Sequence, residues 1–240
     1  MSSIPEGLLA IDIETASPHK EPGRDNFQNT SYFELVAIGL GYQAGPGETI
    51  ETDVLFRDGG WDGESTSDLL QRVDAWCREQ DADGILTHNG EHFDEIHLKG
   101  WAQQVAEQGH WPKAHERISS LLSTHTDLNP LAVERYQHRL ESWRDLVKLE
   151  DVCDWEDVPV PETRYDDYAI GKLTQHEAID DPYVTNIHIG EVLGEAYVEH
   201  KIRDTTETQQ FQELERLLQH YTEADIEPLF KLARRFSGGQ

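Results

Sequence analysis

LLAIDIETAS, residues 8–17, is the stretch that decides the fold. Its apolar part, Leu8–Ile13, predicts a buried strand because it is short and rich in branched residues. Asp12 and Glu14 lie two residues apart, so both carboxylates leave the strand on the same face. Paired carboxylates repel each other unless a cation lies between them, and hard oxygen ligands suit Mg²⁺ or Mn²⁺. In a chain this acidic, the same pair is also typical of a solvated turn.

The rest of the chain predicts a mixed α/β domain around this strand. Two further strands can form an antiparallel meander with it, and two short strands alternate with helices. We expect one domain over residues 1–240, with a helical C-terminal half and an acidic insertion around 142–200, in which Cys153–Gln175 is irregular. The predicted strands after the first are Phe33–Tyr42, Thr49–Arg57, Gly84–Thr87 and His125–Leu128. The predicted helices are Asp68–Arg78, Phe93–Val105, Arg117–Leu122, Leu131–Leu149, Ile187–Lys201, Glu207–Gln219 and Glu223–Arg235.

The composition excludes several classes of protein. Of the 240 residues, 37% are hydrophobic, which is enough to build a core and argues against general disorder. No apolar run approaches the ~18 residues of a membrane span, and we expect no membrane partner. The only cysteines, Cys77 and Cys153, speak against a disulfide scaffold and against a cysteine zinc site. The start of the chain has no basic leader, so we expect a cytoplasmic protein.

The net charge of −27 would normally disfavour nucleic acid as a partner. The acids, however, are spread along the whole chain and form no acidic tail. Dispersed acidity keeps a protein soluble in very high salt, where the Debye length shrinks to ~3 Å. We therefore interpret the charge as the adaptation of a halophilic, haloarchaeal-type surface to high salt. The net charge then does not indicate the partner, which has to be inferred from the local motifs.

A second motif lies in ILTHNGEHFDEIHL, residues 85–98. A predicted strand ends there in the turn pair Asn89-Gly90, and Asp94 follows at the start of the next helix. A carboxylate in that place can reach across the strand ends to Asp12 and Glu14. An ordinary helix N-cap, for which Asp is favoured, is the alternative interpretation of Asp94.

A third motif lies in HYTEADIEPLFKLARR, residues 220–235, and is predicted to open the last helix. Asp225 offers a fourth carboxylate, while Tyr221 or His220 can hold a water molecule. At ~100° per residue, Tyr221 lies about 40° from Asp225 around a helix and His220 about 140° away, which favours Tyr221. A polar helix start is the structural alternative.

The three motifs, in this order along the chain, resemble those of the DnaQ-like (DEDD) 3′–5′ exonuclease superfamily, which has the RNase H-like fold. It is most similar to the predicted exonuclease group related to the proofreading domains of family-B DNA polymerases. The motifs D-x-E, N-x-x-x-x-D and Y-x-x-x-D follow one another about 80 and 130 residues apart, and the likeness covers roughly residues 7–235 without 142–200. The resemblance implies two Mg²⁺ or Mn²⁺ ions held by Asp12, Glu14, Asp94 and Asp225.

The resemblance also implies a function: two-metal-ion hydrolysis of DNA or RNA from a single-stranded 3′ end. In this interpretation Tyr221 orients the attacking water, and substrate contacts come from Thr15, Asn89 and Phe93. Two alternatives stay open: an inactive nucleic-acid-binding module of the same fold, and an acidic interaction protein with chance motifs. Retention of all four acids favours the enzyme. The nearest cations for the substrate backbone are Lys231, Arg234 and Arg235.

Overall fold

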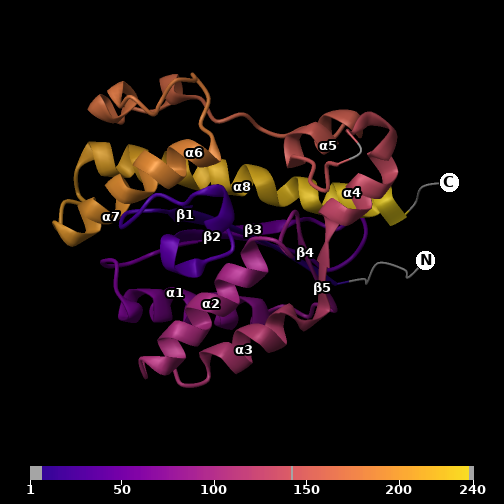
Figure 1. Ribbon diagram of the computed structural model, residues 1–240, viewed down its shortest axis with the longest axis horizontal. Helices are drawn as coiled ribbons and strands as arrows, with labels where there is room; N and C mark the ends of the chain where they lie inside the picture. The colour runs from indigo at the N-terminus through magenta and orange to yellow at the C-terminus, as the bar shows by residue number, and fades with distance from the viewer. Residues whose placement is uncertain (1–6, 142, 238–240) are drawn as a thin grey trace.

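A central five-stranded sheet organises the chain in this computed structural model, which describes residues 7–141 and 143–237 (Figure 1). The strand order is β3-β2-β1-β4-β5; β1, β2 and β3 pair antiparallel, while β4 runs parallel to both β1 and β5. The mixed α/β fold with a helical C-terminal half is therefore confirmed. The strands are β1 (Leu8–Ala16), β2 (Glu34–Gln43), β3 (Glu51–Phe56), β4 (Gly84–Thr87) and β5 (His125–Asp127).

Helices cover both faces of the sheet (Figure 1). Helices α1, α2 and α3 lie on one face, and α8 crosses the other face together with α4 to α7. No helix within the described ranges is both long and apolar enough to cross a membrane. The helices are α1 (Gly63–Glu79), α2 (Asp94–Glu107), α3 (Ala114–Leu121), α4 (Leu128–Tyr136), α5 (Leu149–Trp155), α6 (Asn186–His188), α7 (Gly194–Ile202) and α8 (Gln209–Ser237).

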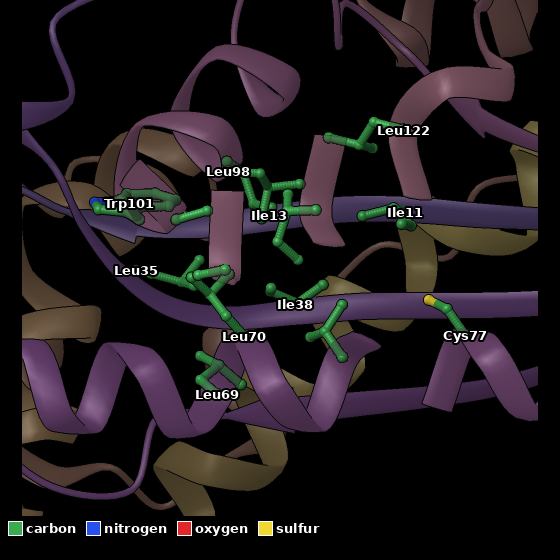
Figure 2. Packing of buried hydrophobic residues seen from close by; sticks show 14 of the residues in the cluster. Ile11, Ile13, Leu35, Ile38, Leu69, Leu70, Cys77, Leu98, Trp101 and Leu122 are labelled. Atoms are coloured by element: carbon green, nitrogen blue, oxygen red, sulfur yellow. The ribbon is translucent and has the colours of Figure 1, made fainter. Parts of the chain in front are cut away.

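The two-residue period of β1 decides which face receives its acids. Ile11 and Ile13 are buried against α1 and α2, as Figure 2 shows. The alternate residue Ala10 belongs instead to the cluster that contains the apolar residues of α8. Because side chains of a strand alternate between faces, Asp12 and Glu14 leave β1 on the side covered by α8.

Two glycines of β2 let α8 lie close to the sheet. A Cβ atom at Gly41 would come within 2.5 Å of the Cγ2 atom of Ile226, and one at Gly39 within 2.8 Å of the Cγ2 atom of Thr222. Gly39 is also the residue of β2 that pairs with Asp12. The missing side chains therefore bring the middle of α8 against the acidic end of β1.

Adding a methyl group in this contact is expected to destabilise the fold. Gly41→Ala should lower the free energy of unfolding by about 1–3 kcal/mol, because its Cβ overlaps Ile226 and Phe230 of α8 in a packed core. Urea unfolding measures the difference. Gly45→Ala is the matched control, since its Cβ would meet nothing nearer than the Glu48 Cγ atom at 3.8 Å. Equal stability of the two variants would contradict this role for Gly41.

The helix predicted over Leu131–Leu149 is wrong in its second half. Helix α4 ends at Tyr136, and after a short 3₁₀ turn the chain folds back on the start of α4. There the Asn129 side chain accepts a hydrogen bond from the Val147 N–H at 2.9 Å and donates one to the Asp145 carbonyl at 3.1 Å. These side-chain bonds take the place of helical ones for the returning loop.

The segment predicted as irregular, Cys153–Gln175, begins inside a helix. Its first three residues complete α5, whose Val152 and Cys153 are buried. Beyond α5 the prediction holds, because only short 3₁₀ turns interrupt the extended chain up to Gln175. The crossing passes over α8 (Figure 1).

The two helices predicted at Glu207–Gln219 and Glu223–Arg235 are one continuous helix, α8. The predicted break includes the β-branched Thr222, which is buried inside α8, and the helix also continues through the buried Pro228. An apolar face that runs the length of α8 packs on the sheet and outweighs these local preferences. The third motif therefore lies in the middle of a helix and does not open one.

Candidate metal centre

Three carboxylates converge where β1 meets α8. Asp12, Glu14 and Asp225 each offer one oxygen, and these three oxygens lie within 4.8 Å of one another. Glu14 is only 5% exposed, so the pair on β1 is no solvated turn. The Thr222 hydroxyl, one turn before Asp225 on α8, donates a hydrogen bond to the Glu14 Oε1 atom at 3.4 Å. We refer to Asp12, Glu14 and Asp225 as the acidic cluster.

A β-bulge lies at the end of this cluster. The register between β1 and β2 shifts between Glu14 and Thr15. A bulge bends the strand and changes the direction of its side chains. Just beyond it, the Ser17 N–H donates to the Gly190 carbonyl at 3.1 Å, which ties the end of β1 to the helical segment before α7. Thr15, a predicted substrate residue, is thus half-buried at the bulge beside the cluster.

Asp94 lies beside the acidic cluster but is not one of its three members. It is the first residue of α2 and only 5% exposed, and its Oδ1 atom accepts a hydrogen bond from the Ile13 N–H at 3.2 Å. It does not act as the N-cap, a position that belongs to Phe93. Its charge nevertheless raises the pKa of both Asp12 and Glu14. Asp94 therefore completes a group of four interacting acids.

Burial and mutual repulsion dominate the electrostatics of these four acids. Burial is the largest cause that raises the pKa of Asp12 and Glu14 well above the ordinary range, followed by their carboxylate neighbours. Burial also raises the pKa of Asp94 and of Asp225 to about 7. No lysine or arginine in the described chain offsets these shifts. Buried and half-buried oxygen donors without a counter-charge fit a hard divalent cation such as Mg²⁺ or Mn²⁺.

The metal-free protein is expected to lose stability as the pH rises. An acid whose folded pKa lies above its unfolded pKa holds its proton longer in the folded state, so the free energy of unfolding falls between the two values. For Asp94 and Asp225 this window runs from the unfolded value of 3.8 to about 7. Urea unfolding in a chelator should follow this fall. Asp225→Asn should flatten the slope and the control Asp53→Asn should not; equal slopes for both would contradict the assignment.

The loop of the second motif is fixed by an acid of β5. Asn89 has a left-handed backbone conformation with φ of 67°, which asparagine tolerates better than most residues. The Asp127 carboxylate accepts hydrogen bonds from the Asn89 N–H at 2.7 Å and from the Glu91 N–H at 3.0 Å. Because β1, β4 and β5 are parallel, their carboxyl ends bring this loop to the same edge as the cluster.

The predicted substrate residues Asn89 and Phe93 line one cavity. The Phe93 ring packs edge-on against Phe33, with centroids 5.3 Å apart, and against His97 at 4.3 Å, so part of it belongs to the core. The Asn89 Oδ1 atom is buried and has no hydrogen-bond partner in the part of the chain that the structure describes. The cavity measures about 430 Å³, and its other walls include Arg24, Phe27, His92 and Leu146.

The third motif faces a larger cavity of about 540 Å³. Tyr221 and Asp225 lie one helical turn apart on α8 and both line it. The opposite wall comes from Glu150 and Cys153 of α5 and from residues 158–163. Residues 150–185, which belong to the segment that the resemblance leaves unaligned, thus cover the candidate site.

The two candidates for the water-holding residue point in different directions. The Nδ1 atom of His220 lies 2.7 Å from the Tyr168 hydroxyl and 3.4 Å from the Thr163 hydroxyl, so the ring faces the covering segment. Tyr221 lines the same cavity as Asp225, and after burial the charges of Glu14, Asp225 and Asp12 raise its pKa. The geometry therefore places Tyr221 at the cluster.

Three polar residues of the site are absent from the sequence-based prediction. Thr222 bonds Glu14, Asp127 holds the Asn89 loop, and Glu150 raises the pKa of Asp225. Asp127 had a usable signal, because it is an acid at the end of a predicted strand in HTDL, residues 125–128. Thr222 and Glu150 carry no such signal, since only the packing of α8 brings them to the cluster.

Comparison with known proteins adds no family to this picture. No protein-family model matches the chain, and no curated protein is significantly similar to it. The contacts of the acidic cluster and its two neighbouring cavities are therefore the basis for assigning a function.

Proposed function

We propose that the chain is a metal-dependent 3′–5′ exonuclease that hydrolyses the phosphodiester bonds of DNA or RNA by a two-metal-ion mechanism. One observation carries the proposal: oxygens of the buried Glu14 and the half-buried Asp12 and Asp225 lie within 4.8 Å of one another, with no cationic side chain among the described residues to neutralise them. Isolated buried charges of one sign are costly, so the arrangement calls for a bound cation. The motif order that resembles DnaQ-like exonucleases agrees with this function.

In this proposal the four acids hold Mg²⁺ or Mn²⁺ at the carboxyl ends of the parallel strands. Asp12, Glu14 and Asp225 supply the converging oxygens, and Asp94 supplies the oxygen that the Ile13 N–H leaves available. Divalent ions bound there activate a water molecule and neutralise charge on the phosphate. The Thr222 hydroxyl holds the Glu14 carboxylate in place through its hydrogen bond.

Tyr221 orients the attacking water in this mechanism. Burial and the nearby carboxylates raise the pKa of its phenol, so the hydroxyl stays protonated at neutral pH. A protonated phenol donates or accepts a hydrogen bond but is no base. Tyr221 therefore would position the water molecule and would not take its proton.

The cavity at Asn89 and Phe93 is the natural place for the terminal nucleotide. The exposed side of the Phe93 ring offers a stacking surface for a base, and such stacking is tolerant of sequence. The buried Asn89 Oδ1 atom gains a partner if a hydroxyl or amino group of the nucleotide donates to it. Thr15, at the bulge, borders the same edge of the sheet.

Digestion of labelled oligonucleotides tests the proposed activity. Single-stranded DNA and RNA carrying a 5′ label are incubated with the chain in concentrated KCl, with Mn²⁺ or with a chelator. We expect a ladder that shortens from the 3′ end with Mn²⁺ and no cleavage with the chelator. A 3′-phosphorylated substrate serves as the control for polarity. Binding without cleavage would indicate a non-catalytic nucleic-acid-binding module, and neither binding nor cleavage would indicate an interaction protein.

A further inference from the structure

A further cavity, separate from the one at Asn89, adjoins the cavity at Asp225 along α8. It measures about 410 Å³ and lies between α8 and the loop that follows α5. Val158 and Pro159 line both cavities, so the two share a wall. The far side of the further cavity is basic, and its three cations on α8 are Lys231, Arg234 and Arg235. We call this cavity the basic groove.

The basic groove stands out against the charge of the chain. Its three cations face a single lining carboxylate, Asp157, in a protein whose net charge is −27. Lys231 pairs with the exposed Glu227, with Nζ and Oε1 2.7 Å apart, and the Arg234 guanidinium contacts the Gln43 side chain. Arg235 is exposed and lines the groove. An anion is the ligand that such a groove attracts.

The spacing along α8 fits an extended phosphate chain. Lys231 follows Asp225 by six residues and Arg235 follows it by ten, which corresponds to roughly 9 Å and 15 Å of helix. A stacked nucleic acid strand advances about 3.4 Å per nucleotide. The cations therefore lie roughly three to four nucleotides from the acidic cluster, and a more extended strand reaches them with fewer nucleotides.

We infer that the basic groove binds the backbone phosphates of the substrate strand upstream of the scissile bond, so that the enzyme prefers chains of several nucleotides over dinucleotides. This inference rests on the proposed exonuclease function, because it takes the acidic cluster as the place of cleavage. Phosphate contacts position a strand and carry no sequence information, so the preference is for length and not for sequence.

A charge-removing double variant tests the inference. Lys231→Gln/Arg235→Gln keeps Arg234 and its contact with Gln43, and therefore spares the packing of α8. The readout is the ratio of kcat/KM for an octanucleotide to kcat/KM for a dinucleotide. We expect this ratio to fall roughly tenfold through a higher KM for the octanucleotide, because two charge-assisted contacts are lost.

The control variant removes the same charge elsewhere. Lys172→Gln/Arg203→Gln takes two surface cations from outside the groove, and Arg203 pairs with Glu199 one turn away, as Lys231 does with Glu227. Circular dichroism melting of both variants verifies that each is folded. The control should keep the wild-type length preference.

Fluorescence anisotropy of a labelled octanucleotide measures binding without cleavage. The groove variant should bind roughly tenfold more weakly than the control, and the slope of log affinity against log salt should shrink by about 1.4, or about 0.7 for each lost phosphate contact. Equal binding by the two variants would overturn the inference. If wild-type protein cleaves neither oligonucleotide, the proposed function fails, while the anisotropy still decides whether the groove binds the strand.

Discussion

Asp12→Ala is expected to reduce cleavage by at least roughly 10³-fold while the protein stays folded, because the lost carboxylate carries metal and not core packing. Asp12 is one of three acids whose oxygens lie within 4.8 Å of one another, and burial, followed by the charges of the other acids, raises its pKa. Its removal takes a ligand from the candidate metal centre and leaves the buried apolar side of β1 unchanged. Single-turnover cleavage of a labelled oligonucleotide measures the loss.

The same variant separates a metal ligand from a structural residue. Without metal, Asp12→Ala should have an unchanged or slightly higher free energy of unfolding, since a source of like-charge repulsion is gone. Asp53→Ala, on the edge strand β3, is the control and should keep full activity. Full activity in the Asp12 variant would contradict the exonuclease proposal, and a large loss of stability in chelator would instead make Asp12 a structural residue.

Tyr221→Phe is expected to lower the turnover rate by roughly 10²-fold and to leave metal affinity nearly unchanged. The substitution removes only the hydroxyl that orients the attacking water, and keeps the ring that packs beside the cavity. Because the raised pKa of Tyr221 keeps the phenol protonated, the rate should show no titration of this group near neutral pH. Stopped-flow cleavage and a Mn²⁺ titration measure the two quantities.

His220→Ala is the matched control for this prediction. The imidazole bonds the Tyr168 hydroxyl on the covering segment, so its loss should have a much milder effect on the rate. A larger loss with His220→Ala than with Tyr221→Phe would reverse the assignment.

The sheet and the direction of its acids could be predicted because they depend on local patterns. The apolar run Leu8–Ile13 predicts a strand, whose two-residue period decides which side chains share a face, and Gly84–Thr87 is bounded by turn residues. The parallel pairing of β1 with β4 then brings Asn89 to the edge where Asp12 lies. The positions of the first two motifs at strand ends were therefore enough to predict that their side chains meet at one edge of the sheet.

The covering of the site could not be predicted, because it depends on contacts between distant segments. Glu150 reaches the cavity only through the packing of α5 against α8. The sequence of its segment has no clear hydrophobic period from which this packing could be predicted. Gly39 and Gly41 lie in the predicted strand Phe33–Tyr42, but nothing in the sequence indicates that they let α8 approach the sheet. The continuity of α8 through Thr222 likewise reflects burial on the sheet and not helix propensity.

Calorimetric titration of Mn²⁺ into the protein tests most directly whether the buried acids form a metal centre. Because burial holds the pKa of Asp94 and Asp225 at about 7, binding at neutral pH should release protons, and the measured heat should depend on the buffer. We predict two bound ions per chain in the wild type, with binding lost or strongly weakened in Asp225→Asn and retained in Asp53→Asn. Absence of Mn²⁺ binding to the folded wild type, or equal binding by Asp225→Asn, would contradict the account.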